Sequence, residues 1–187
     1  MTGNGIRHKR HSIRLQGYDY TQQGMYFVTI VTHQRECLFG DIQDGVMRLN
    51  ELGKIANSEW HRSGEIRAEI KLDIFVVMPN HLHGIVIIVG AHGHVGAHGH
   101  VGAHGRAPLR TPYRPPKSLG SFIAGYKSVV TKCINQMRDT PAIPVWQRNY
   151  QERIIRNEKE LTRIREYISN NPAQWTLDKE NQTTGYL

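Results

Sequence analysis

Two histidines, His81 and His83, stand two residues apart directly after an apolar stretch of the chain. In a β-strand, residues i and i+2 point to the same face, so this spacing predicts two imidazoles side by side. Two neutral imidazoles can chelate one divalent ion, and such a clamp leaves coordination positions open, as a catalytic ion requires. The same spacing also fits a pair of surface histidines on a half-exposed strand.

Strands are expected on both sides of this pair. Apolar and β-branched stretches predict strands over residues 25–33, 70–78 and 83–89, and the last two are either separate strands or one long strand bent near Pro79. Their nearly unbroken apolar character favours central positions in a sheet that is covered on both faces. Two Gly/Asp turn signals, Gly40-Asp41 and Asp44-Gly45, predict a short hairpin within residues 37–49.

Three helices complete the expected elements. Asn50 is the expected cap of a helix over residues 51–62, and Ser118 or Ser121 caps a second helix that runs to Arg138. Residues 146–150 form a loop or a short strand. A last helix begins near Asn157 and ends at Asn170-Asn171-Pro172, with three residues facing inward: Leu161, Ile164 and Ile168. This order of elements predicts an α+β fold with an antiparallel sheet covered on one face.

A tandem repeat interrupts the pattern. VGAHGH recurs from Val89 up to Gly105, and a Pro-rich stretch follows it. The glycine content argues against a helix or a regular strand, so residues 89–117 are interpreted as a flexible insert without a catalytic role. A chain of 187 residues otherwise predicts one domain over residues 1–187.

The composition narrows the function classes. The chain has 39% hydrophobic and 21% charged residues, which is typical of a globular protein, and no apolar run approaches the roughly 20 residues of a membrane span. The basic N-terminus lacks the apolar core of a secretory signal, and Cys37 and Cys133 lie far apart, so a cytoplasmic protein with free thiols is expected. The net charge of +8 favours polyanionic partners such as nucleic acid.

Two segments resemble a known family. Pro-Asn-His-Leu-His-Gly at residues 79–84 resembles the HUH motif of single-tyrosine transposases. The segment VWQRNYQERIIRN at residues 145–157, with Arg165-Glu166-Tyr167-Ile168 and Asn170-Asn171-Pro172, is similar to the corresponding part of the REP-associated tyrosine transposases. The likeness extends over roughly residues 18–175, with the histidine repeat as an insertion.

The resemblance implies a ferredoxin-like (RRM-like) antiparallel sheet, with helices packed mainly on one face and an additional C-terminal helix. It implies that His81 and His83 bind Mg or Mn, and that a tyrosine on a later helix, which matches Tyr126, attacks single-stranded, hairpin-bearing DNA. A 5′-phosphotyrosine would form and a 3′-OH would leave, without a nucleotide cofactor. The residues expected to hold DNA phosphates are Lys127, Arg148, Arg153 and Arg156.

Several alternatives stay open from the residues alone. Tyr126 falls on an apolar helical stripe, whose spacing favours a core tyrosine; the other candidates are Tyr18, Tyr20, Tyr113 and Tyr150. Relatives carry a carboxamide ligand one turn after the tyrosine, where this chain has Val130, so the third ligand would be Thr131, Asn135, Gln136, Glu152 or water. A hydrolytic metallonuclease and a non-catalytic nucleic-acid-binding module are the alternative functions, and the protein would be a monomer or a homodimer.

Overall fold

The computed structural model describes residues 18–90 and 116–181. The structured elements, in chain order, are β1 (Gly24–Val31), the 3-10 turn η1 (His33–Arg35), β2 (Gly40–Gln43), β3 (Val46–Leu49), α1 (Glu51–Ile66), β4 (Ile70–Met78), β5 (His81–Ile88), α2 (Leu119–Arg138), β6 (Gln151–Ile155), α3 (Glu158–Asn170) and the 3-10 turn η2 (Pro172–Leu177). The insert expected at residues 89–117 lies almost wholly outside the described residues.

The central sheet has four strands in the order β4-β5-β1-β6, and each neighbouring pair is antiparallel. If the small β2–β3 hairpin is set aside, the chain runs β-α-β-β-α-β before α3 begins. This connectivity and strand order confirm the expected ferredoxin-like antiparallel sheet. β5 is central, as expected, whereas the prediction of a central position for β4 is wrong, because β4 lies at the edge of the sheet.

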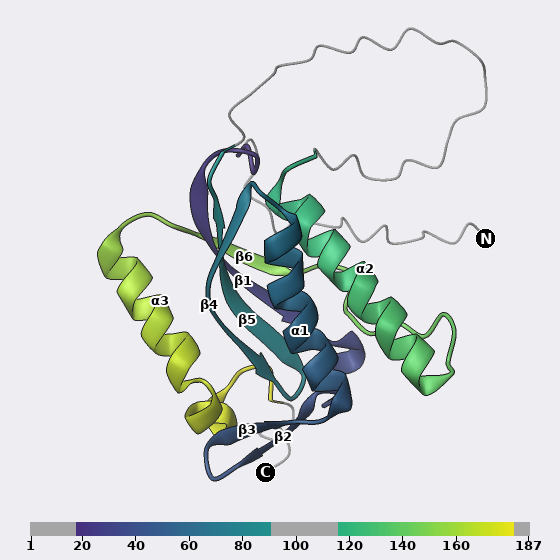
Figure 1. The fold of residues 1–187 in the computed structure, drawn as a ribbon. Helices are drawn as coiled ribbons and strands as arrows, with labels where there is room; N and C mark the ends of the chain where they lie inside the picture. Colours follow the sequence, from purple (N-terminus) through teal and green to yellow (C-terminus); the bar gives the residue numbers. More distant parts are fainter. Residues whose placement is uncertain (1–17, 91–115, 182–187) are drawn as a thin grey trace, which may run out of the picture.

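Helices lie on both faces of the sheet. Figure 1 shows α1 and α2 together on one face and α3 on the other. One cluster of buried residues joins the sheet to α1 and α2 and includes Trp60, Leu82 and Tyr126, whereas a smaller cluster joins it to α3 and includes Ile85 and Ile164. With α1 and α2 on one face and α3 as the additional C-terminal helix, the arrangement implied by the resemblance is confirmed, and α3 covers the second face, as the apolar strands indicated. α1 and α3 both contact β4, so this edge strand is covered on its two faces, which explains why it is so apolar.

Local signals placed most helix and hairpin ends correctly. Asn50 caps α1 by accepting a hydrogen bond from the Gly53 amide, and Ser118 caps α2 by accepting one from Ser121. α1 extends four residues beyond the predicted end at Arg62. The expected hairpin forms around Asp44-Gly45. Among the described residues, no helix combines the length and the apolar character needed to cross a membrane.

One strand boundary was misplaced and one strand was missed. β5 begins at His81 rather than His83, and a turn at Pro79-Asn80 separates it from β4, so the two stretches are separate strands. β6 was not predicted at all. Its sequence, Gln-Glu-Arg-Ile-Ile, does not alternate regularly between polar and apolar residues, and its pairing with β1 at the edge of the sheet specifies it instead.

Candidate functional site

The first two strand positions of β5 that share a face hold the two histidines. His81 lies opposite Val31 of β1 and Met78 of β4, and His83 lies opposite Thr29 and Val76, so strands on both sides fix their direction. Their ring centroids are 4.4 Å apart, as the spacing of two residues predicts, and both side chains are fully buried. Because Leu82 packs into the α1/α2 core, both imidazoles point toward the face covered by α3.

Each histidine is oriented through its Nδ1 atom. His81 Nδ1 lies 2.8 Å from Asn80 Oδ1, and His83 Nδ1 lies 2.9 Å from Thr29 Oγ1. The amide oxygen can only accept, so His81 carries its proton on Nδ1 and presents a lone pair on Nε2. That Nε2 atom is buried and has no hydrogen-bond partner within the described part of the chain. A neighbour on the opposite ring nitrogen is typical of a metal-binding histidine.

Burial keeps both rings neutral. Loss of solvent lowers the pKa of His81 to about 4, and the nearby carboxylates of Asp178 and Glu180 offset this effect only in part. Burial also lowers the pKa of His83 well below its ordinary value, and a charge on His81 would lower it further. At neutral pH the two lone pairs are therefore available to a cation without competition from protons.

A carboxylate joins the histidines. Asp178, in the segment after η2, places Oδ2 4.0 Å from His81 Nε2, and one ligand atom from each of Asp178, His81 and His83 lies within 4.8 Å of the others. Asn171 donates to Asp178 Oδ2 and the Glu180 amide donates to Oδ1, at 3.0 and 2.7 Å. Two imidazoles and one carboxylate, with an unpartnered buried lone pair among them, fit a divalent metal ion.

No local signal in the sequence pointed to Asp178, which only the tertiary structure brings to the histidines. The residues expected as third ligands lie elsewhere. Thr131, Asn135 and Gln136 belong to α2, on the opposite face of the sheet, and Asn135 donates to the carbonyl of Ile143. Glu152 pairs with Val28, whose side chain also belongs to the α1/α2 core. None of these four side chains faces the histidines.

Tyr126 does not meet the histidines either. It is buried between Trp60 and Trp146, and its hydroxyl donates to the carbonyl oxygen of Ala56 at 3.0 Å. Burial raises the pKa of this hydroxyl further above its ordinary value. Since α2 lies on one face of the sheet and the imidazoles point to the other, this geometry does not support Tyr126 as the nucleophile. It is instead the core tyrosine that its apolar stripe indicated.

Tyr167 is the tyrosine beside the histidines. It lies on α3, where its hydroxyl is 3.2 Å from His83 Nε2 and the two ring centroids are 5.2 Å apart. It is 37% exposed, whereas the histidines are buried, so it forms the accessible side of the site. Tyr167 lies within the Glu-Tyr-Ile segment that resembles the transposases, and it is off the inward stripe of its helix. Its place in this segment, off the inward stripe, was the signal in the sequence that could have identified Tyr167 as a candidate site residue.

One helical turn after Tyr167 is Asn171, a carboxamide. Asn171 is buried, and its Oδ1 atom has no hydrogen-bond partner among residues 18–90 and 116–181. The spacing of four residues is the one expected for a carboxamide ligand in relatives, which failed for Tyr126 because that position is Val130. Asn171 therefore adds a fourth candidate ligand, an amide oxygen next to Asp178.

The expected DNA-binding residues fall into two groups. Lys127 donates to the backbone carbonyls of Gln147, Arg148 and Asn149, so its ammonium group fixes the loop that precedes β6. Arg153 lies in the middle of β6 and Arg156 directly after the strand, near the start of α3, and Arg153 pairs with Glu160 at 2.6 Å. The structure brings neither group into contact with the histidines.

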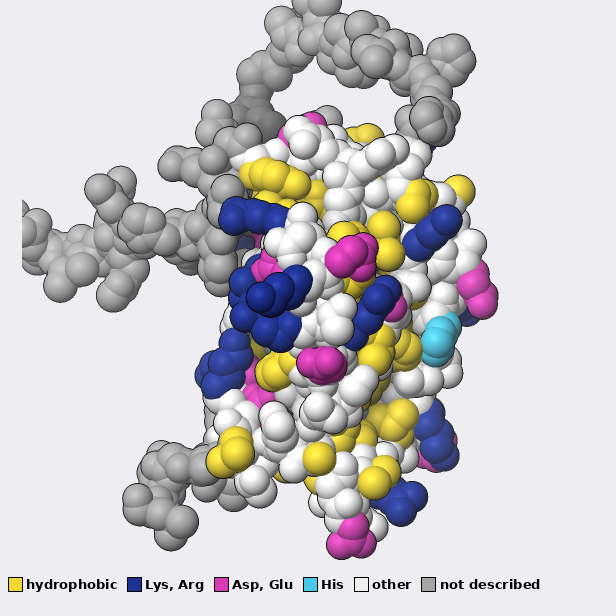
Figure 2. Space-filling model, turned by 90° about the vertical axis from the view of Figure 1, so that its left-hand side faces the viewer, with side chains coloured by type: hydrophobic (Ala, Val, Ile, Leu, Met, Phe, Trp, Pro, Cys, Tyr) yellow, Lys and Arg dark blue, Asp and Glu magenta, His cyan; other side chains and the backbone are white. Residues whose placement is uncertain are grey.

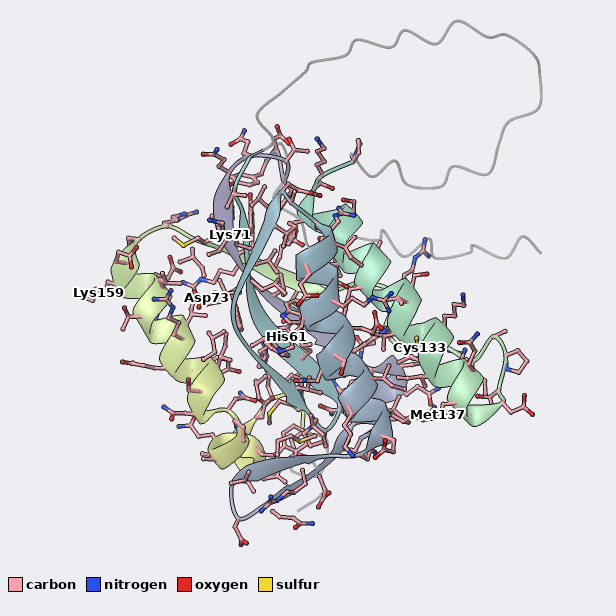
Figure 3. The ribbon with its side chains drawn as sticks, in the orientation of Figure 1. His61, Lys71, Asp73, Cys133, Met137 and Lys159 are labelled. Atoms are coloured by element: carbon pink, nitrogen blue, oxygen red, sulfur yellow. The ribbon has the colours of Figure 1, made fainter. Side chains whose placement is uncertain are left out.

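The face that carries α3 is rich in cations. Figure 2 shows Lys and Arg side chains gathered over it, with carboxylates and hydrophobic side chains between them. Exposed basic residues near the start of α3 are Arg153, Arg156, Lys159 and Arg163. Figure 3 shows Asp73 of β4 between the strand and α3, where Arg165 pairs with it at 2.6 Å and helps to fix the helix that carries Tyr167.

The chain is similar to known proteins both in sequence and in structure. No protein-family model matches the chain. An uncharacterized protein of Haemophilus influenzae is 39% identical over 175 residues, which cover 94% of each chain. The solved structure of a REP-associated tyrosine transposase bound to a REP hairpin superposes with a TM-score of 0.57 at 17% identity, over 87% of this chain and 74% of that one.

At this level of identity, the structural likeness concerns the fold, and it confirms the one that the sequence resemblance implied. The likeness between the two sequences extends over nearly their full length. The chain therefore belongs to the same family as the Haemophilus influenzae protein, and it shares the fold of the REP-associated tyrosine transposase.

Proposed function

We propose that the protein is a metal-dependent transesterase of single-stranded, hairpin-bearing DNA, with Tyr167 as its nucleophile. One observation carries the proposal: the Tyr167 hydroxyl lies 3.2 Å from His83 Nε2, at the edge of a buried cluster of His81, His83 and Asp178. A tyrosine beside two strand-borne histidines is the arrangement that the transposase resemblance implies. The hairpin in the solved transposase structure supports the same class of DNA partner.

The reaction follows from the reach of the phenol oxygen. A bond forms between the Tyr167 oxygen and phosphorus, the bond from phosphorus to the 3′ oxygen breaks, and the protein retains a 5′-phosphotyrosine. The phenol loses one proton and the leaving 3′ oxygen gains one, so the step needs neither an oxidant nor a nucleotide. The phosphodiester energy is kept in the new bond, which makes later rejoining feasible.

Burial and the carboxylate of Asp178 raise the pKa of Tyr167, so its hydroxyl is protonated at neutral pH when the cluster holds no cation. A divalent ion held by His81, His83 and Asp178 would polarise the scissile phosphate and offset the negative charge of the carboxylate. Asn171 is placed to add an oxygen ligand. The proposed chemistry is therefore metal-dependent, and Mn suits the imidazole ligands better than Mg does.

The DNA path is proposed to follow α3. Lys159 precedes Tyr167 by eight residues, which is about 12 Å along a helix, or roughly two phosphates of an extended strand. Arg153, Arg156 and Arg163 lie near it and would hold neighbouring phosphates through salt-sensitive contacts. Such a path brings the backbone to the exposed side of Tyr167. A DNA substrate also favours a cytoplasmic location for the proposed activity.

The test uses labelled single-stranded hairpin DNA with Mn²⁺ or Mg²⁺, followed by denaturing electrophoresis. Wild type should form an adduct that survives denaturation. Tyr167→Phe should abolish this adduct while retaining DNA binding, and Tyr126→Phe should form it normally, because Tyr126 lies on the other face of the sheet. An adduct that persists in Tyr167→Phe would refute the assignment of the nucleophile.

The same experiment separates the alternatives. Cleavage without any adduct would indicate a hydrolytic metallonuclease, in which water replaces the tyrosine. DNA binding without cleavage, and without a requirement for metal, would indicate a non-catalytic nucleic-acid-binding module. The contact between Tyr167 and His83 favours the transesterase over both.

A further inference from the structure

We propose that an ion pair between Arg35 and Glu180 holds the segment at residues 178–180 in the position that brings Asp178 to the metal site. The two residues would be positioning residues, since neither contacts the histidine rings. The inference rests on the proposed metal site. It predicts that the metal affinity depends on Arg35, which contacts Glu180 and none of the three proposed ligands.

The segment after η2 is held by polar contacts rather than by apolar packing. Asp178 and Glu180 are buried, whereas Lys179 between them is exposed and Leu177 before them is 84% exposed. A short segment without a helix or strand of its own has little intrinsic order, so its position depends on the contacts that it makes. The carboxylate of Asp178 can only be as well placed as this segment.

Glu180 makes three of these contacts. Its carboxylate, 2% exposed, accepts a hydrogen bond from Arg35 Nε at 2.9 Å. Its backbone carbonyl accepts one from Asn80 Nδ2 at 2.7 Å, and its backbone amide donates to Asp178 Oδ1 at 2.7 Å. The last contact links Glu180 directly to the proposed ligand. A displacement of Glu180 would therefore move Asp178.

Arg35 is itself held in place by an unusual backbone. Gln34 and Arg35 in η1 both have left-handed dihedrals, with φ of 53° and 56°, which non-glycine residues adopt only where contacts compensate the strain. One such contact is the hydrogen bond from Asn80 Nδ2 to the Arg35 carbonyl at 3.2 Å. This turn directs the guanidinium toward the C-terminal segment.

Asn80 connects the segment at residues 178–180 to the histidines. One amide group bonds to His81 Nδ1 through its oxygen and to the carbonyls of Arg35 and Glu180 through its nitrogen. The orientation of His81 and the position of the Asp178 segment are thus set by one side chain. A substitution of Asn80 would disturb both. A substitution of Arg35 tests the position of the Asp178 segment alone, and is therefore the better experiment.

Loss of the guanidinium would leave the Glu180 carboxylate buried without its countercharge. Such a charge is relieved by moving into solvent, and the segment would carry Asp178 with it. Removal of partners outside the first coordination shell typically lowers metal affinity about 10- to 100-fold. We expect a loss of about that size for Arg35→Ala, and a partial recovery for Arg35→Lys, which restores a cation.

The experiment is a titration of the full-length protein with Mn²⁺, followed by electron paramagnetic resonance of the free ion. Arg62→Ala is the matched control, because it removes an arginine that pairs with Glu59 on α1, away from the histidines. Glu180→Gln keeps the size of the side chain and should weaken binding in the same direction. Thermal unfolding in EDTA then identifies variants that bind metal weakly because the whole fold is lost, and not because the Asp178 segment is displaced.

Weaker Mn²⁺ binding in Arg35→Ala and Glu180→Gln, with Arg62→Ala like wild type, would support the inference. Wild-type affinity in both variants would overturn it while leaving the metal site intact. A higher affinity or a stronger adduct in Arg35→Ala would also overturn it, because the segment would then obstruct the site. If wild type itself bound no Mn²⁺, both the proposed metal site and the role of the Arg35–Glu180 ion pair would be refuted.

Discussion

Acidification should destabilise the metal-free protein through His81. Burial lowers the pKa of this residue to about 4 from an ordinary value of 6.5. Between these two pH values the unfolded chain binds a proton that the folded chain does not, so the free energy of unfolding falls as the pH falls. At pH 5, about 1.5 units below the ordinary pKa, the loss relative to pH 7 is about 2 kcal/mol for this one group.

The assay is urea unfolding in EDTA at pH 7 and pH 5, with His81→Asn as the comparison. Asparagine keeps a donor near the Asn80 oxygen but cannot take up a proton. Wild type should lose about 2 kcal/mol more than the variant over this interval. His83, whose pKa is also lowered by burial, titrates in the same direction in both proteins. Equal losses in the two proteins would refute the reasoning.

Three further outcomes are expected. Tyr126→Phe should lower the free energy of unfolding by about 1 kcal/mol, because the hydrogen bond to the Ala56 carbonyl is lost, and should leave adduct formation unchanged; a loss of the adduct without a loss of stability would contradict this. Gly53→Ala should lower it by about 1–3 kcal/mol in urea unfolding despite the better helix propensity of alanine, because its Cβ would lie 2.1 Å from the Phe39 carbonyl oxygen. Arg156→Ala should reduce the slope of log affinity for single-stranded DNA against log salt by about 0.7, one phosphate contact; an unchanged slope would remove Arg156 from the DNA path.

Local signals in the sequence determined where most elements begin and end. The caps at Asn50 and Ser118 and the inward stripe of α3 are interactions between residues close in the chain, so they can be read without the fold. The same holds for the pair of histidines, whose shared direction follows from the period of a strand. By contrast, β6 depends on pairing with β1 and has no such local signal.

The geometry disfavours Tyr126 as the nucleophile because Tyr126 and the histidines lie on opposite faces of the sheet. β1 and β4 run parallel, as do β5 and β6, because each member of a pair is antiparallel to the strand between them. Right-handed crossovers then place α1 and α2 on the same face of the sheet. Since Leu82 turns toward that face, the histidines must point away from α2 and Tyr126. In a ferredoxin-like sheet of this kind, a tyrosine beside the histidines has to come from an element on the other face, as Tyr167 of α3 does.

Asp178 marks what only the tertiary structure decided. The sequence determined a pair of imidazoles and the helix that carries Tyr167, because period and capping act over a few residues. The carboxylate reaches the histidines through contacts with Asn171 and Glu180, and Glu180 is held in turn by Arg35. Asp178 is distant in the chain from the histidines, as Glu180 is from Arg35, so no spacing rule predicts their meeting. The packing of α3 and the C-terminal segment against the sheet brings them together.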